Sequence, residues 1–300
     1  IGAPFMIGSM SLNNQMRFQG NATFAMFGML SGAIVNIILL PILIFVCKLG
    51  ILGAGLGTLI GQITGFFVLF AMSRKGENLR ISPKNISLCS GYFKEILRGG
   101  TPSLTRQGLG AISTILLNVA AGAYGDAAIA GMSIVTRLSF IVMSVVIGLG
   151  QGFQPFCGFN YGAKLYPRVK SGFYFSVKVS AAFLVFCALA GFPFAAQIVN
   201  VFRADPEVVA VGAVAFRWQI VTYPLISVIM ISNMMMQTTG HAVQANILAA
   251  SRNGLFFIPF ILVLPHLFGI LGVEICQAVS DICSFVLALP LTSKVLSEMK

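Results

Sequence analysis

The sequence predicts an all-α, polytopic membrane protein, and three observations support that fold class. Hydrophobic residues make up 57% of the 300 residues and charged residues only 9%, against about 25% charged in an ordinary soluble domain. Uncharged runs recur along the chain, and the run over 138–163 is longer than the roughly 20 residues that a bilayer-spanning helix needs. Most cations gather in short segments between these runs, which is typical of cytoplasmic loops and argues against a nucleic-acid-binding face.

The first part of the chain predicts about three membrane-spanning helices. Residues 1–16 form the end of a helix whose beginning we expect to precede this sequence. Two uncharged spans follow, one over 18–47 and one from the glycine-rich corner after Lys48 to about residue 73. We therefore assign 1–73 to the end of an N-terminal lobe.

The composition changes abruptly over 74–91. This segment holds four cations, Arg74, Lys75, Arg80 and Lys84. Because short cytoplasmic loops collect Lys and Arg, we predict that it is a cytoplasmic linker between two lobes. The remainder, 92–300, is then a C-terminal lobe.

Six helices are predicted in the C-terminal lobe, over 92–124, 126–158, 173–202, 205–237, 241–264 and 270–294. Asp205 followed by Pro206 predicts an N-cap and a first-turn proline. The glycine-rich stretch 148–162 predicts the exit of a helix from the membrane, because Lys164 and Arg168 follow it closely.

Counting the partial first helix gives nine spans, and their alternation predicts the orientation. It places most loop cations on one side of the membrane, against Lys48 and Arg203 on the other. The positive-inside tendency then puts both the 74–91 linker and the C-terminus in the cytoplasm. We expect a multi-pass monomer in the inner (plasma) membrane of the cell.

An internal repeat explains the odd number of spans. The segment 13–22 recurs as 233–242 with the same Asn, Gly and Ala positions, and 49–53 recurs as 268–272 at nearly the same offset. Applied to the start of the C-terminal lobe, the offset implies roughly 128 residues, about three helices, before this sequence. The whole protein would then hold two six-helix units of the same orientation, with the first incomplete here, which is a recurrent transporter plan.

Four motifs carry a family resemblance. They are the glycine-rich run Gly148–Gly162 with Ala163 after it, the Gly100-Thr-Pro102 opening of one helix, the Tyr124-Gly-Asp-Ala-Ala-Ile-Ala130 opening of the next, and the glycine-rich run Gly53-Ala-Gly-Leu-Gly57. Together they resemble the multidrug and toxic compound extrusion (MATE) transporters, from helix four to helix twelve. The resemblance implies a secondary antiporter that exports amphipathic, cationic drugs or metabolites in exchange for H⁺ or Na⁺ by alternating access, without any other cofactor.

Charged residues at membrane depth predict the functional site. Arg106, Arg137, Arg217 and Asp281 each lie about ten residues into their predicted helices, near the middle of a core about 30 Å thick. Each would cost roughly 3 kcal/mol or more facing lipid, so we predict that they pair or line a water-filled cavity. The polar helix faces give these candidate cavity residues: Arg106, Gln107, Thr114, Asn118, Arg137, Gln151 and Gln154. Interhelical hydrogen bonding without a role in transport is the alternative.

The coupling ion, H⁺ or Na⁺, needs a carboxylate, and here the chain departs from the family pattern. Sodium-coupled members carry acids in helices seven and ten, whereas 99–125 and 208–238 contain none. Other members use an aspartate in helix one, which would precede this sequence. The ion site is therefore expected there or at Asp281, and we favour the former because a nearby arginine would keep Asp281 ionised.

Two other functions are alternatives to drug export. A lipid-linked oligosaccharide flippase of the same superfamily would use the arginines for an anionic head group. An enzyme has no support, because two histidines and six scattered cysteines give neither a catalytic constellation nor metal-ligand spacing. The methionines, among them the run 234–236, suit either an adaptable substrate pocket or a lipid-facing surface.

Overall fold

The structure is a computed structural model that describes residues 2–74 and 90–299. The prediction of an all-α, polytopic fold is confirmed, because these residues form helices joined by short turns and contain no strand. Seven of the helical segments in the described ranges are long and apolar enough to cross a membrane. Most of the predicted 74–91 linker lies outside the described residues, which include only its two ends. The chain divides into two compact units, Ile1–Leu88 and Cys89–Lys300.

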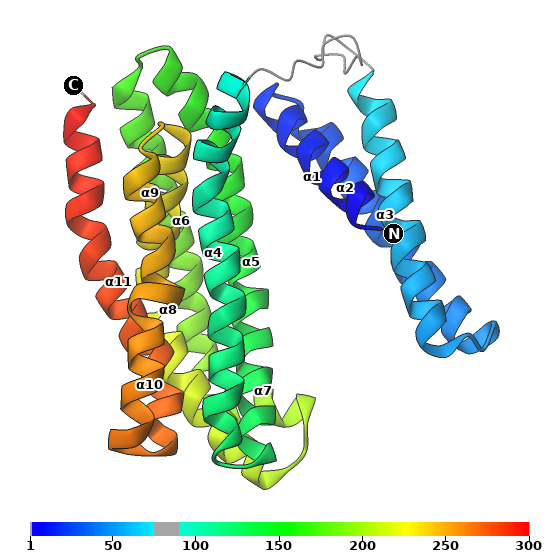
Figure 1. Ribbon diagram of the computed structural model, residues 1–300, viewed down its shortest axis with the longest axis vertical. Helices are drawn as coiled ribbons and strands as arrows, with labels where there is room; N and C mark the ends of the chain where they lie inside the picture. The colour runs from blue at the N-terminus through cyan, green and yellow to red at the C-terminus, as the bar shows by residue number, and fades with distance from the viewer. Residues whose placement is uncertain (1, 75–89, 300) are drawn as a thin grey trace. The chain divides into compact units, whose positions relative to one another are not determined.

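The first unit contains three long helical segments (Figure 1). They are α1 (Ala3–Phe18), α2 (Ala22–Pro41) with its continuation as the π-helical turn η1 (Ile42–Val46), and α3 (Gly50–Ser73). Helices α2 and α3 approach closely through glycines: a Cβ atom added to Gly32 would lie 2.7 Å from the carbonyl oxygen of Gly61. Small residues that let two backbones approach in this way are typical of helix pairs in membranes.

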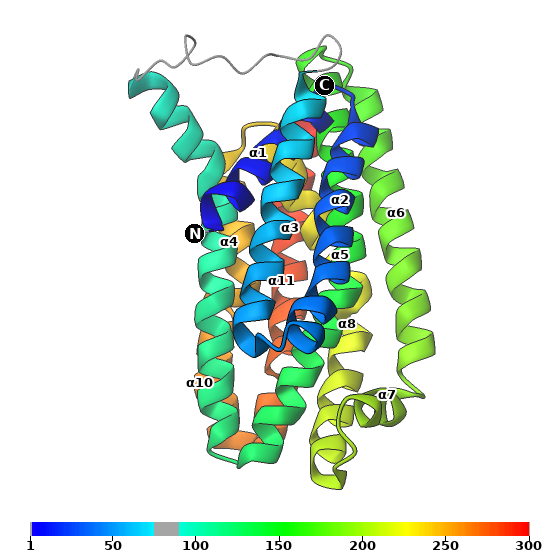
Figure 2. The same cartoon turned by 90° about the vertical axis from the view of Figure 1, so that its right-hand side faces the viewer.

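The second unit is a bundle of long helices that stand side by side (Figures 1 and 2). Its elements are α4 (Ser90–Gly122), α5 (Asp126–Gly162), α6 (Tyr166–Gly191), α7 (Ala195–Phe202), α8 (Pro206–Thr238), α9 (Ala242–Ala250), η3 (Ser251–Leu255), α10 (Phe257–Phe268) and α11 (Ile270–Glu298). The segments α9, η3 and α10 together make one span. Helix α8 packs against α5, α6 and α11 and is the most buried of the candidate spans in the described residues.

The bounds of one predicted helix in this unit, over 173–202, are wrong, because the observed α6 begins earlier, at Tyr166. The predicted helix over 173–202 is divided at 192–194 into α6 and the short α7, which lies crosswise at one end of the bundle (Figure 2). Pro193 explains the division, because proline lacks a backbone N–H and disfavours helical geometry in the residue before it.

The helix predicted over 126–158 is observed as α5, which continues four residues further, to Gly162, so the glycine-rich stretch 148–162 is helical throughout. Tight packing compensates for the low helix propensity of glycine: a side chain on Gly150 would collide with the sulfur atom of Met234 in α8. The turn that follows is only three residues long, and Lys164 adopts a left-handed conformation in it with φ 58°. The predicted N-cap of α8 is confirmed, because the Glu207 amide donates to Asp205 Oδ1 at 3.1 Å.

The structure supports the internal repeat with matched contacts in the two units. Asn13 Nδ2 donates to the Ala25 carbonyl at 2.8 Å, and Asn233 Nδ2 donates to the Ala245 carbonyl at 2.7 Å. Both hydrogen bonds cross the same kind of turn, since the glycine at its centre has φ 85° in the first copy and 83° in the second. Each asparagine therefore joins the end of one helix to the start of the next in the same way.

Candidate functional site

A cavity of about 380 Å³ lies inside the second unit. Its walls come from α4, α5, α8, the α9–η3–α10 span and α11. Polar side chains of Arg106, Gln107, Ser113, Thr114, Thr136, Ser139, Gln219, Asn233, Arg252, Asn253 and Gln277 line part of it. Apolar side chains of Leu117, Phe140, Met143, Ile147, Ile229, Met230, Leu248 and Phe257 line the rest, so the cavity offers both kinds of surface.

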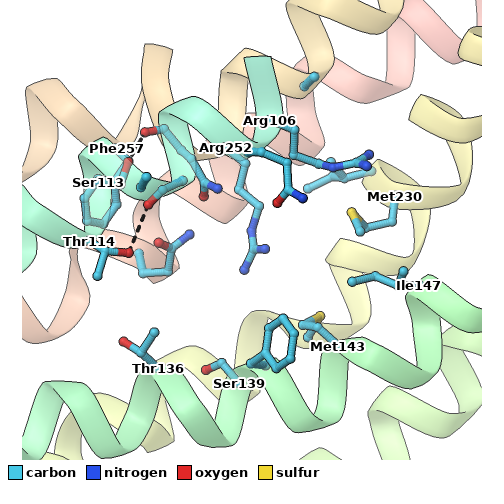
Figure 3. A pocket seen from close by; sticks show the side chains of 18 of the residues that line it. Arg106, Ser113, Thr114, Thr136, Ser139, Met143, Ile147, Met230, Arg252 and Phe257 are labelled. Atoms are coloured by element: carbon cyan, nitrogen blue, oxygen red, sulfur yellow. Dashed lines mark hydrogen bonds between the residues drawn. The ribbon is translucent and has the colours of Figure 1, made fainter. Parts of the chain in front are cut away.

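A buried ion pair forms one end of the polar wall. Arg252 Nε donates to Asp281 Oδ1 at 2.7 Å, and Arg252 Nη2 donates to Oδ2 at 3.5 Å. Gln277 Nε2 and Thr222 Oγ1 also donate to this carboxylate, at 2.9 and 3.4 Å. The Asp281 side chain is 1% exposed and that of Arg252 is 22% exposed. Only the cation of the pair therefore reaches the cavity, and Figure 3 shows its guanidinium pointing into the open centre.

The π-helical turn η3 explains how Arg252 reaches this position. In η3 the Phe256 amide donates to the carbonyl of Ser251, five residues earlier, at 3.1 Å. Such a turn leaves neighbouring carbonyls without their usual helical partners. Here hydroxyl groups from other helices satisfy them: Ser280 donates to the Arg252 carbonyl at 2.5 Å, and Ser113 donates to the Asn253 carbonyl. The turn is thus held from α11 and from α4.

Arg106 lies on the α4 wall, and its only hydrogen bond among the described residues is to a neutral group. Its Nη1 donates to Asn233 Oδ1 in α8 at 3.3 Å. The amide nitrogen of Asn233 is itself bound to the Ala245 carbonyl, so that side chain is fixed in place. Unlike Arg252, Arg106 has no carboxylate partner within the described ranges.

A second polar cluster joins α5 to α8 at the opposite wall. Ser139 Oγ donates to Gln219 Oε1 at 2.6 Å, and the Tyr223 hydroxyl donates to Ser139 Oγ at 2.8 Å. Thr136, Met143 and Ile147 lie along the same helix and face the cavity together with Ser139 (Figure 3). The α5 wall is therefore polar toward one end and apolar toward the other.

The structure brings together only some of the residues predicted for the cavity. Arg106, Gln107 and Thr114 line it. The other four predicted cavity residues, Asn118, Arg137, Gln151 and Gln154, are not part of its lining. On α5 the helix presents the neighbouring face to the cavity, so Thr136 and Ser139 line it while Arg137 is exposed elsewhere on the unit.

The interior position of Asp281 agrees with the sequence analysis, but its partner was not among the arginines considered there. Arg217 lies outside the cavity, where its Nε donates to the Phe192 carbonyl at the end of α6 at 3.4 Å. Arg252 was missed although a signal was available: it is the only Lys, Arg, Asp or Glu between residues 242 and 268. The methionines at 234–236 are buried in the helical core, and so belong neither to the cavity wall nor to a lipid-facing surface.

The described residues contain no group of three or more His, Cys, Asp or Glu side chains that could hold a metal ion. The arrangement can instead bind a compound that has both polar and apolar parts. Pockets of this kind, with a few convergent polar groups on an apolar wall, are the usual sites for small organic molecules.

Comparison with known proteins finds multidrug export proteins among the relatives of this chain. The multidrug export protein MepA of Staphylococcus haemolyticus is 30% identical over 287 residues, which cover 95% of this chain and 63% of that protein. MepA of Staphylococcus aureus strain MSSA476 is 29% identical over 278 residues, which cover 91% of this chain and 60% of that protein. The chain thus spans somewhat less than two thirds of the length of these relatives.

Two solved structures share the fold. The MATE transporter VcmN of Vibrio cholerae, in a mutant form, matches with a TM-score of 0.88 and 20% identity, over 98% of this chain and 68% of that chain. A MOP superfamily transporter from Pyrococcus furiosus matches with a TM-score of 0.91 and 22% identity, over 99% of this chain and 68% of that chain. The MatE family model matches residues 102–263. Since that match covers more than half of the sequence, this chain belongs to the MatE family.

Proposed function

We propose that the protein is a secondary active transporter that exports amphipathic organic compounds in exchange for H⁺ or Na⁺. The observation that carries this proposal is the cavity of the second unit, which joins polar side chains to an apolar wall at membrane depth. Family membership and the names of the multidrug export relatives support the same activity. Alternating access of two six-helix lobes, with 1–73 as the end of the first and 92–300 as the second, is the proposed mechanism.

The charge of the cavity bears on the substrates. Among the described residues that line it, Arg106 and Arg252 are the only ionisable ones. The expectation that the substrates are cationic therefore has no support in this cavity, and a cationic group would need carboxylates from another part of the protein. Neutral and anionic amphipathic compounds fit the wall as it stands.

The coupling ion site is proposed to lie outside the described residues of this chain. Asp281 was the alternative, but it accepts hydrogen bonds from Arg252, Gln277 and Thr222. Binding H⁺ or Na⁺ there would require the protein to give up an ion pair first. The pairing favours a structural role for Asp281.

A lipid-linked oligosaccharide flippase is the second candidate, and the two cavity arginines are the observation that favours it. The two candidates differ in the compound that they transport, so an assay of both compounds distinguishes them. Efflux of drug-like dyes by the full-length protein in proteoliposomes supports export of small compounds. Transfer of a lipid-linked sugar without dye efflux would favour the flippase.

Transport through the cavity is tested by filling it. Ala111 lines the cavity from α4, whereas Ala182 is exposed on α6 away from it. We expect Ala111→Phe to reduce ion-gradient-driven dye efflux from proteoliposomes by roughly tenfold or more, because the ring occupies space that the substrate needs. Ala182→Phe is the matched control and should transport normally. Equal activity of the two variants would contradict transport through this cavity.

The proposed setting of the protein follows from the sequence and the family. We infer a monomer in the inner (plasma) membrane, with the 74–91 linker and the C-terminus in the cytoplasm. Its proposed partners are the lipid bilayer and small organic substrates, without nucleic acid.

A further inference from the structure

We propose that Arg106 and Arg252 form a binding site for the anionic group, a carboxylate, sulfonate or phosphate, of the amphipathic compound that occupies the cavity. The identification of that compound as a transported substrate rests on the proposed function. The charge of the site itself rests only on the geometry of the second unit.

The two members of the Arg252–Asp281 pair differ in their exposure to the cavity. The carboxylate is 1% exposed and lies behind the guanidinium, which is 22% exposed and lines the cavity. Nε and Nη2 of Arg252 are engaged by Asp281. Within the described part of the chain no acceptor binds Nη1, so this nitrogen can donate to a ligand. Although the pair is neutral as a whole, only its positively charged member is exposed to the cavity.

Arg106 supplies a charge that nothing in the described residues neutralises. Its hydrogen bond goes to the uncharged amide of Asn233, and no Asp or Glu lines the same cavity. A cation at membrane depth is costly unless an anion or water compensates it. A guanidinium also presents several N–H groups in one plane, which match the oxygens of a carboxylate or phosphate. The cavity therefore favours an anionic group beside Arg106.

The opposite wall limits what the rest of the ligand can be. Phe140, Met143 and Ile147 of α5 line the cavity. Figure 3 shows Met143 and Ile147 across from Arg252. A volume of about 380 Å³ is at the small end of the range for organic ligands. The site thus suits a small molecule with an acidic group at one end and an aromatic or aliphatic body at the other.

The experiment compares two probes that share one fluorophore, the anionic dansylglycine and the cationic dansylcadaverine. Fluorescence anisotropy measures their binding to the full-length protein in phosphatidylcholine nanodiscs. We expect Arg106→Gln to weaken dansylglycine binding by roughly 10- to 100-fold, because a hydrogen bond between two charged groups is lost. Binding of dansylcadaverine should not weaken.

Two further variants separate loss of the site from loss of the fold. Lys178→Gln is the matched control, because Lys178 is an exposed cation of α6 that does not line the cavity. It should bind both probes as the unmodified protein does. Arg106→Lys keeps the charge and should bind dansylglycine more tightly than Arg106→Gln. If Arg106→Gln leaves dansylglycine binding unchanged, or weakens both probes equally, the proposal is wrong.

A lipid headgroup could supply the same anionic chemistry as a soluble substrate. Repeating the measurement in nanodiscs that contain phosphatidylglycerol distinguishes the two sources. Competition by this lipid upholds the anion site and identifies a lipid ligand, whereas undiminished probe binding upholds it for a soluble compound. Because the assay uses no ion gradient, binding that depends on Arg106 without any efflux would refute the transport proposal and leave the site standing.

Discussion

Helix α11 carries two buried carboxylates whose surroundings differ. Asp281 is paired with Arg252 and has two further hydrogen-bond donors. Glu274 lies about two turns earlier, is only 5% exposed, and makes no hydrogen bond or ion pair with any other described residue. The same helix therefore offers a comparison of a compensated and an uncompensated buried acid.

The two acids predict opposite effects on stability. Asp281→Asn leaves the partly buried Arg252 cation without its partner, which should cost up to about 3–5 kcal/mol and lower the melting temperature of the purified full-length protein. Glu274→Gln removes a buried charge that has no counter-ion, so stability should be unchanged or increased.

Replacing both members of the pair, with Arg252→Gln and Asp281→Asn together, should recover much of the stability lost in the single Asp281 variant. A destabilisation by Glu274→Gln as large as that of Asp281→Asn would contradict this account. If Asp281→Asn instead folds normally but abolishes the dependence of efflux on H⁺ or Na⁺, Asp281 carries the coupling ion.

The sequence predicts residue depth better than it predicts partners. The position of Asp281 along its helix was enough to expect it in the interior of the lobe, because a charge near the middle of a span must avoid lipid. Which arginine contacts Asp281 depends on how the packed helices are rotated about their axes relative to one another. Arg252 also reaches it from a π-helical turn, whose extra residue changes the helical phase that a regular spacing assumes.

At the scale of helices, the predictions succeeded where hydropathy decides and failed where packing does. The N-cap at Asp205 was recognisable because capping is local. The glycine-rich stretch 148–162 has a low helix propensity, yet it is helical throughout, and within it Gly150 packs against Met234. Propensity is a weak guide when neighbouring helices satisfy the segment.

Helices α2 and α3 pack closely through their glycines. A Cβ atom on Gly32 would lie 2.7 Å from the Gly61 carbonyl oxygen, whereas one on Gly55 in α3 meets nothing within 4 Å. We expect Gly32→Ala to cost about 1–3 kcal/mol through overpacking. Gly55→Ala should be neutral or stabilise α3 by about 0.5–1 kcal/mol. Thermal melting of the full-length variants measures both, and equal melting temperatures would contradict the close helix contact.

The whole second unit has two chemically different ends. At one end, the turn before α9 meets the end of α11, where His241 Nε2 lies 3.0 Å from Glu298 Oε2. Helices α5 and α8 both start at the opposite end of the unit, so the end of α5 lies at the same end as the turn before α9. Lys164 in the turn after α5 and Arg168 in the first turn of α6 therefore belong to this end. At the opposite end, the Tyr124 hydroxyl donates to the Pro265 carbonyl at 3.1 Å. Acidic residues begin the helices there, at Asp126 and at Glu207.

This distribution of charge predicts the orientation of the protein in the membrane. Lys and Arg collect on the cytoplasmic side, so the end with Lys164 and the C-terminus should face the cytoplasm and the end with Arg203 should face outward. Single cysteines in a cysteine-free, full-length background test this at two exposed positions, Arg203 and Ser297. A membrane-impermeant maleimide should label Arg203→Cys in intact cells. It should label Ser297→Cys only after permeabilisation, because the bilayer shields that end. The reverse labelling pattern would contradict this orientation, because the end with Arg203 would then face the cytoplasm.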